Sequence, residues 1–222
     1  MSGEQDDAGA APRTIRQAGR PPLTERRKAE IRREIARQAV RLFNTKGVAA
    51  TSAEEIAAAA GISVRTLWRH FPNKEHCVLP LLNEPLGVTI QAVLRWHPGH
   101  DAAELVDAME HGAEEAVAAD KMGNDIPALL DLVRLTRTEP GLRLVWIRSR
   151  DEAEQMLADA LARRAGLTAP DLTVRVHAAV MNSALQAAME HYAFHTSPTA
   201  GDPAALRKMI RDALLIAAHG LS

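Results

Sequence analysis

Two short helical segments joined by a glycine constrain this chain more than any other stretch. Within Thr51–Lys74, Thr51 or Ser52 can cap a first helix, and the glutamates that follow can complete a capping box. Gly61 can end that helix, and Ser63 is placed to cap a second one. This spacing predicts a helix-turn-helix, a motif that presents its second helix to the major groove of DNA.

The second helix, expected from Val64 to about His70, has an outward face suited to DNA. Leu67 and Phe71 occupy inward positions, and the helical period leaves another set of side chains free to point outward: Val64, Arg65, Trp68 and Arg69. Short capped helices with a glycine turn also occur in all-α domains that never touch nucleic acid. Two arginines, a tryptophan and a histidine within six residues favour DNA binding over that alternative.

The same stretch resembles the DNA-binding region of the TetR family of transcriptional regulators. The chain carries the family's residue type at Thr51, Ser52, Ile56, Ala57, Ala60, Gly61, Ile62, Ser63, Thr66, Leu67, His70, Phe71, Asn73, Lys74 and Glu75. It departs at Trp68, where the family usually has a tyrosine that reaches a phosphate; an indole N–H can donate a hydrogen bond but cannot accept one.

The resemblance implies DNA contacts residue by residue. Positions that face bases are matched by Val64, Arg65 and Trp68, and positions that face phosphates by Ser52, Thr66, Trp68, His70 and Lys74. Of these, Arg65 is the candidate for a bidentate contact to guanine, and Lys74 for a phosphate contact at another expected helix start. The candidate DNA-binding set is Ser52, Ser63, Val64, Arg65, Thr66, Trp68, Arg69, His70 and Lys74.

Positive charge is concentrated in the same part of the chain. Between Arg13 and Lys74 there are fourteen Lys and Arg against five Asp and Glu, a net charge of +9 in a chain whose total is −1. A basic run is often only a solvated face. A run confined to the segment that bears a helix-turn-helix is the footprint expected of phosphate neutralisation.

The chain divides into three expected regions: a disordered basic arm over residues 1–23, a helix-turn-helix domain over residues 24–73, and an effector-binding and dimerisation domain over residues 74–222. A long first helix is predicted from Glu25 to Lys46, ended by Gly47. Six more helices are predicted, the first kinked or split by Pro80 and Pro85: Lys74–Arg95, Asp101–Lys121, Asp125–Arg137, Gly141–Ala165, Asp171–His195 and Pro203–Gly220. Because no β-type alternation appears, the fold class is all-α.

The last two helices suit a homodimer. Leu172–Tyr192 carries apolar residues on more than one face, with small residues such as Ala184 and Ala188 between them, and Leu206–Leu214 carries an apolar stripe. TetR-like proteins dimerise through their last two long helices as a four-helix bundle, which this pattern resembles. The alternative is that both helices are buried in a larger monomeric core.

A lipophilic effector of low molecular mass is the expected ligand of the C-terminal domain. A TetR-like fold would bring residues from several helices around one cavity, namely Trp96, Met109, Trp146, Met181 and Tyr192. Arg143, Arg148 and Arg150 cluster around Trp146 and could pair with an anion at its mouth, although a solvated basic face is the alternative. The stretch over residues 135–165 vaguely resembles relatives that sense fatty-acyl thioesters.

Enzymatic, metal and membrane functions find no support in the sequence. No phosphate loop, nucleophile elbow or zinc-protease motif is present, and we expect no cofactor. The single Cys77, although near His70 and His76, lacks the paired spacing of a metal site and is expected to pack under the DNA-binding helices. No uncharged apolar run reaches membrane-spanning length, which fits a cytoplasmic protein.

These observations predict a homodimeric, one-component transcriptional regulator, most simply a repressor, that a small effector releases from a palindromic double-stranded operator. The helix over Lys74–Arg95 joins both domains and is the expected transmitter. Two alternatives remain: a sequence-independent architectural DNA-binding protein, and a helical enzyme with an attached DNA-binding segment. The operator, the effector and the regulated genes are not specified by the sequence.

Overall fold

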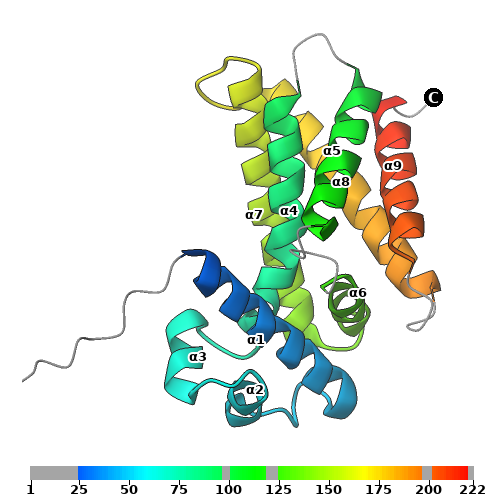
Figure 1. Cartoon of the computed structure of the whole chain (residues 1–222). Coiled ribbons are helices and arrows are strands. Elements are labelled where there is room, and N and C mark those ends of the chain that lie inside the picture. Colours follow the sequence, from blue (N-terminus) through cyan, green and yellow to red (C-terminus); the bar gives the residue numbers. More distant parts are fainter. Residues whose placement is uncertain (1–24, 97–100, 119–124, 197–201, 220–222) are drawn as a thin grey trace, which may run out of the picture.

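The computed structural model describes residues 25–96, 101–118, 125–196 and 202–219. Every regular element in these ranges is a helix (Figure 1), so the all-α expectation is confirmed. The expected basic arm lies outside the described residues. In chain order the elements are α1 Glu25–Lys46, α2 Ala53–Ala59, α3 Val64–His70, the 3-10 helix η1 Glu75–Val78, α4 Leu79–Arg95, α5 Ala102–Ala118, α6 Ile126–Leu135, α7 Pro140–Arg164, α8 Leu172–His195 and α9 Pro203–His219.

Helix α1 has the predicted bounds and one fully buried face. Ile35, Ala36, Ala39, Val40 and Phe43 are at most 1% exposed, and they follow the three-to-four spacing of a single helical stripe. Gly47 ends the helix with φ +84°, and its N–H donates to the carbonyl of Phe43 at 2.9 Å. An ion pair between Lys46 and Glu55 then joins the end of α1 to α2.

The helix-turn-helix forms through the expected local signals. Ser52 caps α2 in a complete capping box with Glu55: the Glu55 N–H donates to the Ser52 hydroxyl at 3.2 Å, and the Ser52 N–H donates to the Glu55 carboxylate at 2.8 Å. Gly61 supplies the left-handed turn with φ +66°. Ser63 caps α3 by accepting from the Thr66 N–H at 3.2 Å.

The segment after α3 is split, as the two prolines suggested, but only the first of them marks the break. A 3-10 turn, η1, precedes α4, and Pro80 lies in the first turn of α4, where its missing N–H costs nothing. Pro85 lies inside α4, which continues through it. By length and mean hydropathy of 1.4, Glu75–Arg95 is a candidate membrane span, and its helix α4 packs against α1, α5 and α7.

Helices α4, α5, α7 and α9 run roughly in the same direction in the upper part of Figure 1, and α8 crosses them obliquely. Helices α1, α2 and α3 lie below them. Helix α6 lies between the two parts and contacts α1 as well as α8. Two apolar clusters hold this arrangement together. One joins α1, α2 and α3 to η1, α6 and the start of α7, and the other joins α4, α5, α7, α8 and α9.

Candidate DNA-binding surface and effector pocket

The outward face of α3 carries large cationic and aromatic side chains. Trp68 is 44% exposed, Arg65 and Arg69 are exposed, and together with Thr66 they line a shallow hollow in the surface. Leu67, on the opposite face, is fully buried. An exposed tryptophan flanked by two arginines leaves guanidinium and indole donors available to a DNA groove.

Several other candidate DNA-binding residues near α2 and α3 already make contacts within the protein. Ser52 and Ser63 are both engaged as helix caps, and the Ser63 hydroxyl also shares a 2.9 Å hydrogen bond with the Thr66 hydroxyl. Val64 is partly buried and packs against the core, which corrects the expectation that it points freely outward. A base contact by Val64 would therefore come only from the exposed part of its side chain.

His70 lies in a strongly basic environment at the end of α3. Burial lowers the pKa of its imidazole, and the nearby charges of Arg69, Arg32 and Lys28 lower it further. Its Nε2 atom is buried and has no hydrogen-bond partner among the described residues. Because Lys28 and Arg32 belong to α1, cationic side chains of α1 lie near the end of α3.

Lys74 makes hydrogen bonds within the protein, and its expected phosphate contact stays a prediction. Its ammonium donates to the carbonyl of Val48 at 2.6 Å and to the carbonyl of Thr51 at 3.0 Å. Lys74 precedes only the four-residue η1, so the expected helix start is not an α-helix with an N-terminal dipole. These bonds fix the loop between α1 and α2 onto the segment after α3, because they satisfy carbonyls that no helix uses.

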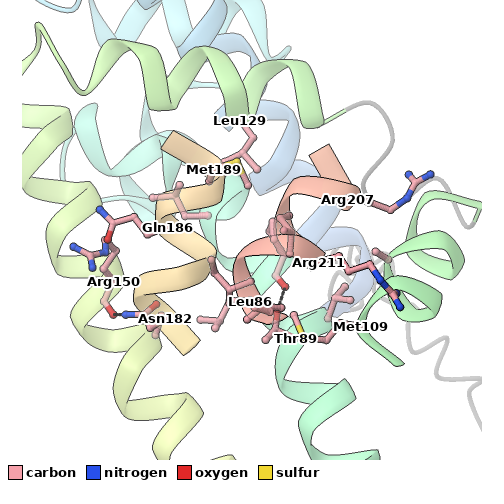
Figure 2. Close-up of a pocket in the computed structure, with 18 of the residues that line it drawn as sticks. Leu86, Thr89, Met109, Leu129, Arg150, Asn182, Gln186, Met189, Arg207 and Arg211 are labelled. Atoms are coloured by element: carbon pink, nitrogen blue, oxygen red, sulfur yellow. Dashed lines mark hydrogen bonds between the residues drawn. The ribbon is translucent and has the colours of Figure 1, made fainter. Parts of the chain in front are cut away.

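An apolar cavity of about 190 Å³ lies within the C-terminal domain (Figure 2). It is bordered by all six helices from α4 to α9. Its apolar lining comes mainly from Leu82, Leu86, Val106, Met109, Leu129, Trp146, Leu185, Met189, Ile210 and Leu214. A small cavity with this lining and a few polar groups can bind an apolar molecule in a defined orientation.

The structure brings only two of the five expected pocket residues, Met109 and Trp146, to this cavity. Trp96 instead lies beneath Arg164, whose guanidinium carbon is 3.5 Å from the ring centroid. Tyr192 joins α8 to α9, since its hydroxyl accepts from the Asp202 N–H at 2.7 Å and donates to the Asp202 carbonyl at 2.8 Å. Met181 packs against the second apolar cluster outside the lining.

Sequence reasoning missed the α4 wall of the cavity. Leu82, Leu86 and Thr89 line it from positions four and three residues apart, which is one helical face. Pro80 and Pro85 indicate where this segment is interrupted, but they do not indicate which face of α4 lines the cavity. The apolar spacing of α4 was the signal that could have identified the wall.

The three arginines around Trp146 have separate surroundings. Arg143 pairs with Glu190 at 3.1 Å, and Arg148 is exposed. Only Arg150 lines the cavity. Trp146 itself donates from its indole N–H to Glu190 at 3.2 Å. The expected cluster of three is thus reduced to one arginine at the cavity.

A partly buried ion pair connects the DNA-binding helices to the pocket region. Arg37 of α1 lies 2.5 Å from the carboxylate of Asp125, which directly precedes α6 and has a side chain only 6% exposed. Leu129, one helical turn further along α6, lines the cavity. A shift of α6 would therefore be felt at both the cavity and α1.

Comparison with known proteins gives matches along most of the chain. Residues 35–81 match the family model described as bacterial regulatory proteins, tetR family, and residues 114–221 match the model described as MftR C-terminal domain. The HTH-type transcriptional regulator TcmR of Streptomyces glaucescens is 29% identical over 156 residues, 68% of this chain and 67% of TcmR. The regulator AcrR of Shigella flexneri is 26% identical over 204 residues, 87% of this chain and 90% of AcrR.

The fold also has solved counterparts. The structure of the fatty acid degradation regulator FadR from Bacillus halodurans matches with a TM-score of 0.52 and 18% sequence identity. The match covers 86% of this chain and 96% of that chain. At this level of identity the likeness concerns the arrangement of helices alone.

The internal bonds of Lys74 lead to a first prediction. Lys74→Ala should lower the free energy of unfolding by about 1–3 kcal/mol, because two carbonyls are deprived of a charged donor. Arg69→Ala should leave stability unchanged and instead reduce the slope of log affinity against log salt by about 0.9 for each phosphate that Arg69 neutralises. Urea unfolding and DNA titrations at several salt concentrations measure both. The opposite pattern would show that Lys74 serves DNA and not the fold.

Proposed function

Since the chain belongs to the TetR family of transcriptional regulators, we propose that it is a homodimeric repressor that an apolar small molecule releases from a palindromic operator. Regulators of this family are sequence-specific DNA-binding proteins and are not enzymes. The architectural and enzymatic alternatives are therefore not favoured. We propose that the protein acts in the cytoplasm, as regulators of this family generally do. We also propose that residues 24–73 bind DNA and that residues 74–222 bind the effector and form the dimer.

The apolar cavity is the observation that carries the effector part of this proposal. Two helices that line it, α4 and α6, also contact α1, the long helix that braces the helix-turn-helix. A molecule that fills the cavity thus touches the elements that hold the DNA-binding helices in place. A ligand shifts a conformational equilibrium by its difference in affinity for the two states, and this cavity supplies a physical site for that difference.

The geometry of operator binding explains how such a shift would act. Two copies of α3 must lie about one DNA turn, roughly 34 Å, or a comparable groove-to-groove spacing apart to enter the two half-sites of a palindrome. Displacement of α4 or α6 in each subunit changes this separation. Helix α6 can transmit the change from the cavity to α1 in addition to α4. The Arg37–Asp125 ion pair joins α1 to the start of α6 through a nearly buried carboxylate.

The proposed dimer surface lies on the exposed faces of α8 and α9. Leu172, Val176 and Val180 follow one another at four-residue spacing on α8 and are 78%, 49% and 42% exposed, and Ile216 of α9 is 71% exposed. Such a stripe of aliphatic side chains suits a second copy of the same chain. The small residues predicted for this role fit less well, since Ala188 is 3% exposed within its own subunit.

DNA reading by α3 is tested at Arg65. Arg65→Ala should cost about 1–3 kcal/mol in operator affinity and relax specificity at one base pair in each half-site. Selection from randomised DNA, followed by titration of operators altered at single positions, measures both effects. Arg148→Ala serves as the control, because it removes an exposed arginine on α7, outside the helix-turn-helix. An equal reduction on all sequences would mean that Arg65 contacts only phosphates.

Operator release is tested with a panel of compounds and one filled-cavity variant. Apolar compounds should release wild-type protein from its operator, whereas Ala113→Phe, which places a ring in the cavity lining, should abolish the response to them. The same change at Ala116, on α5 but outside this lining, is the control. A response to small, highly polar compounds alone, or an Ala113→Phe variant that responds like wild type, would contradict the apolar pocket.

Dimerisation is tested on α8. Val176→Glu should convert the dimer to a monomer and reduce operator affinity, because a carboxylate at an apolar interface carries a penalty of several kcal/mol when it finds no partner. Sedimentation at micromolar concentration reports the assembly state. Gln155→Glu, at an exposed position on α7 outside the proposed dimer surface, controls for added charge. Wild-type protein that sediments as a monomer would remove the dimer from the proposal.

A further inference from the structure

We propose that Arg150 forms a carboxylate subsite, so that the effector is a small monocarboxylate with an apolar chain or ring; this rests on the effector-controlled function proposed above. The observation behind it is an arginine donor with no partner at the edge of an otherwise apolar cavity. Arg150 belongs to α7 and lines the cavity, and its Nε atom is buried without a hydrogen-bond partner among the described residues. A buried, unpaired donor of this kind is costly, and a bound carboxylate would satisfy it.

The backbone around Arg150 is held in place. Its carbonyl accepts a hydrogen bond of 3.1 Å from the side-chain amide of Asn182 on α8, and Asn182 is only 7% exposed. Figure 2 shows Arg150, Asn182 and Gln186 on the same side of the pocket. Arg150 of α7 and Asn182 of α8 are thereby tied to each other at this end of the cavity.

The Glu190 carboxylate, which accepts a hydrogen bond from Gln186, already has other donors. Glu190 accepts hydrogen bonds on one carboxylate oxygen from Gln186 at 2.8 Å, Arg143 at 3.1 Å and Trp146 at 3.2 Å. Burial opposes the ionisation of Glu190, but these donors hold its pKa below the usual value. Because Glu190 is neutralised by Arg143, the positive charge of Arg150 is left without a carboxylate partner among the described ion pairs.

The opposite side of the cavity carries a carboxylate, Glu110, and two arginines, Arg207 and Arg211. Arg211 of α9 pairs with Asp107 at 2.7 Å and with Glu110 at 2.8 Å, both on α5. The two carboxylates balance the formal charges of Arg211 and Arg207, so this side has no net positive charge. Figure 2 places Arg211 and Arg207 together, away from Arg150. An anionic group is therefore better accommodated at the Arg150 side.

The side chains in the middle of the cavity indicate the chemistry of the part of the ligand that carries no charge. Between the two sides lie aliphatic and thioether side chains, including Leu86, Met109 and Met189, which suit an apolar body of variable shape. The volume of about 190 Å³ is below the roughly 300–1,000 Å³ of pockets for drug-sized ligands. The ligand that fits this combination is a small amphiphile with a single acidic group.

The test compares straight-chain carboxylates from hexanoate to dodecanoate with primary alcohols of the same lengths. Binding to the full-length protein is measured by titration calorimetry, and operator release is followed in parallel. In wild-type protein the best carboxylate should bind at least about tenfold more tightly than its alcohol, the lower end expected for a hydrogen bond to a charged group. Arg150→Gln should remove that difference and leave alcohol binding unchanged, which also shows that the cavity is intact.

Arg148→Gln is the matched control, because Arg148 lies two residues earlier on α7 and is exposed. It should preserve the preference for carboxylates. Equal binding of acids and alcohols, or an Arg150→Gln variant that keeps the preference, would overturn the carboxylate subsite. If alcohols then still release the operator, the apolar-effector function stands without the subsite; if no member of either series binds, the subsite is also overturned, and the compound panel above decides the function separately.

Discussion

Burial of one face of α1 is the constraint on which both halves of this protein depend. Ile35 and Phe43 of α1 share a continuous apolar cluster with Leu67 of α3, and the same cluster includes Leu132 of α6 and Trp146 of α7. Complete burial of one such side chain contributes about 1.5–3 kcal/mol. Because the cluster continues from the DNA-binding helices into the helices that border the cavity, the DNA-binding half has no separate core. The position of α1 therefore depends on the positions of those helices.

Polar groups refine this apolar framework at a few places. The Lys74 ammonium closes the loop after α1 onto the segment after α3, and the Asp125 carboxylate closes α6 onto α1 through Arg37. Loss of Lys74 would leave two carbonyls without a charged donor, and loss of Arg37 would leave the nearly buried Asp125 carboxylate without its cation. The Arg37–Asp125 ion pair is thus a polar contact between the long helix beside the helix-turn-helix and the helix α6 that borders the cavity.

The sequence predicts the elements that depend on neighbours in the chain. The cap at Ser52, the turn at Gly61 and the cap at Ser63 are set by residues at most three positions away, so the helix-turn-helix could be recognised before the structure. Tyr192 shows what could not be predicted in this way, since its distance from the cavity depends on how α8 crosses its neighbours. Arg37 and Asp125 are 88 positions apart, and no local pattern joins them.

The outward face of α3 contributes almost nothing to folding. Arg65 and Arg69 are exposed, Trp68 is 44% exposed, and the residue that anchors the helix, Leu67, points the other way. Substitutions at these three surface positions therefore carry little thermodynamic cost for the scaffold. Because the side chains that face DNA are separate from those that line the cavity, substitutions on α3 can change the preferred operator during evolution or by design. The same substitutions leave the effector response unchanged.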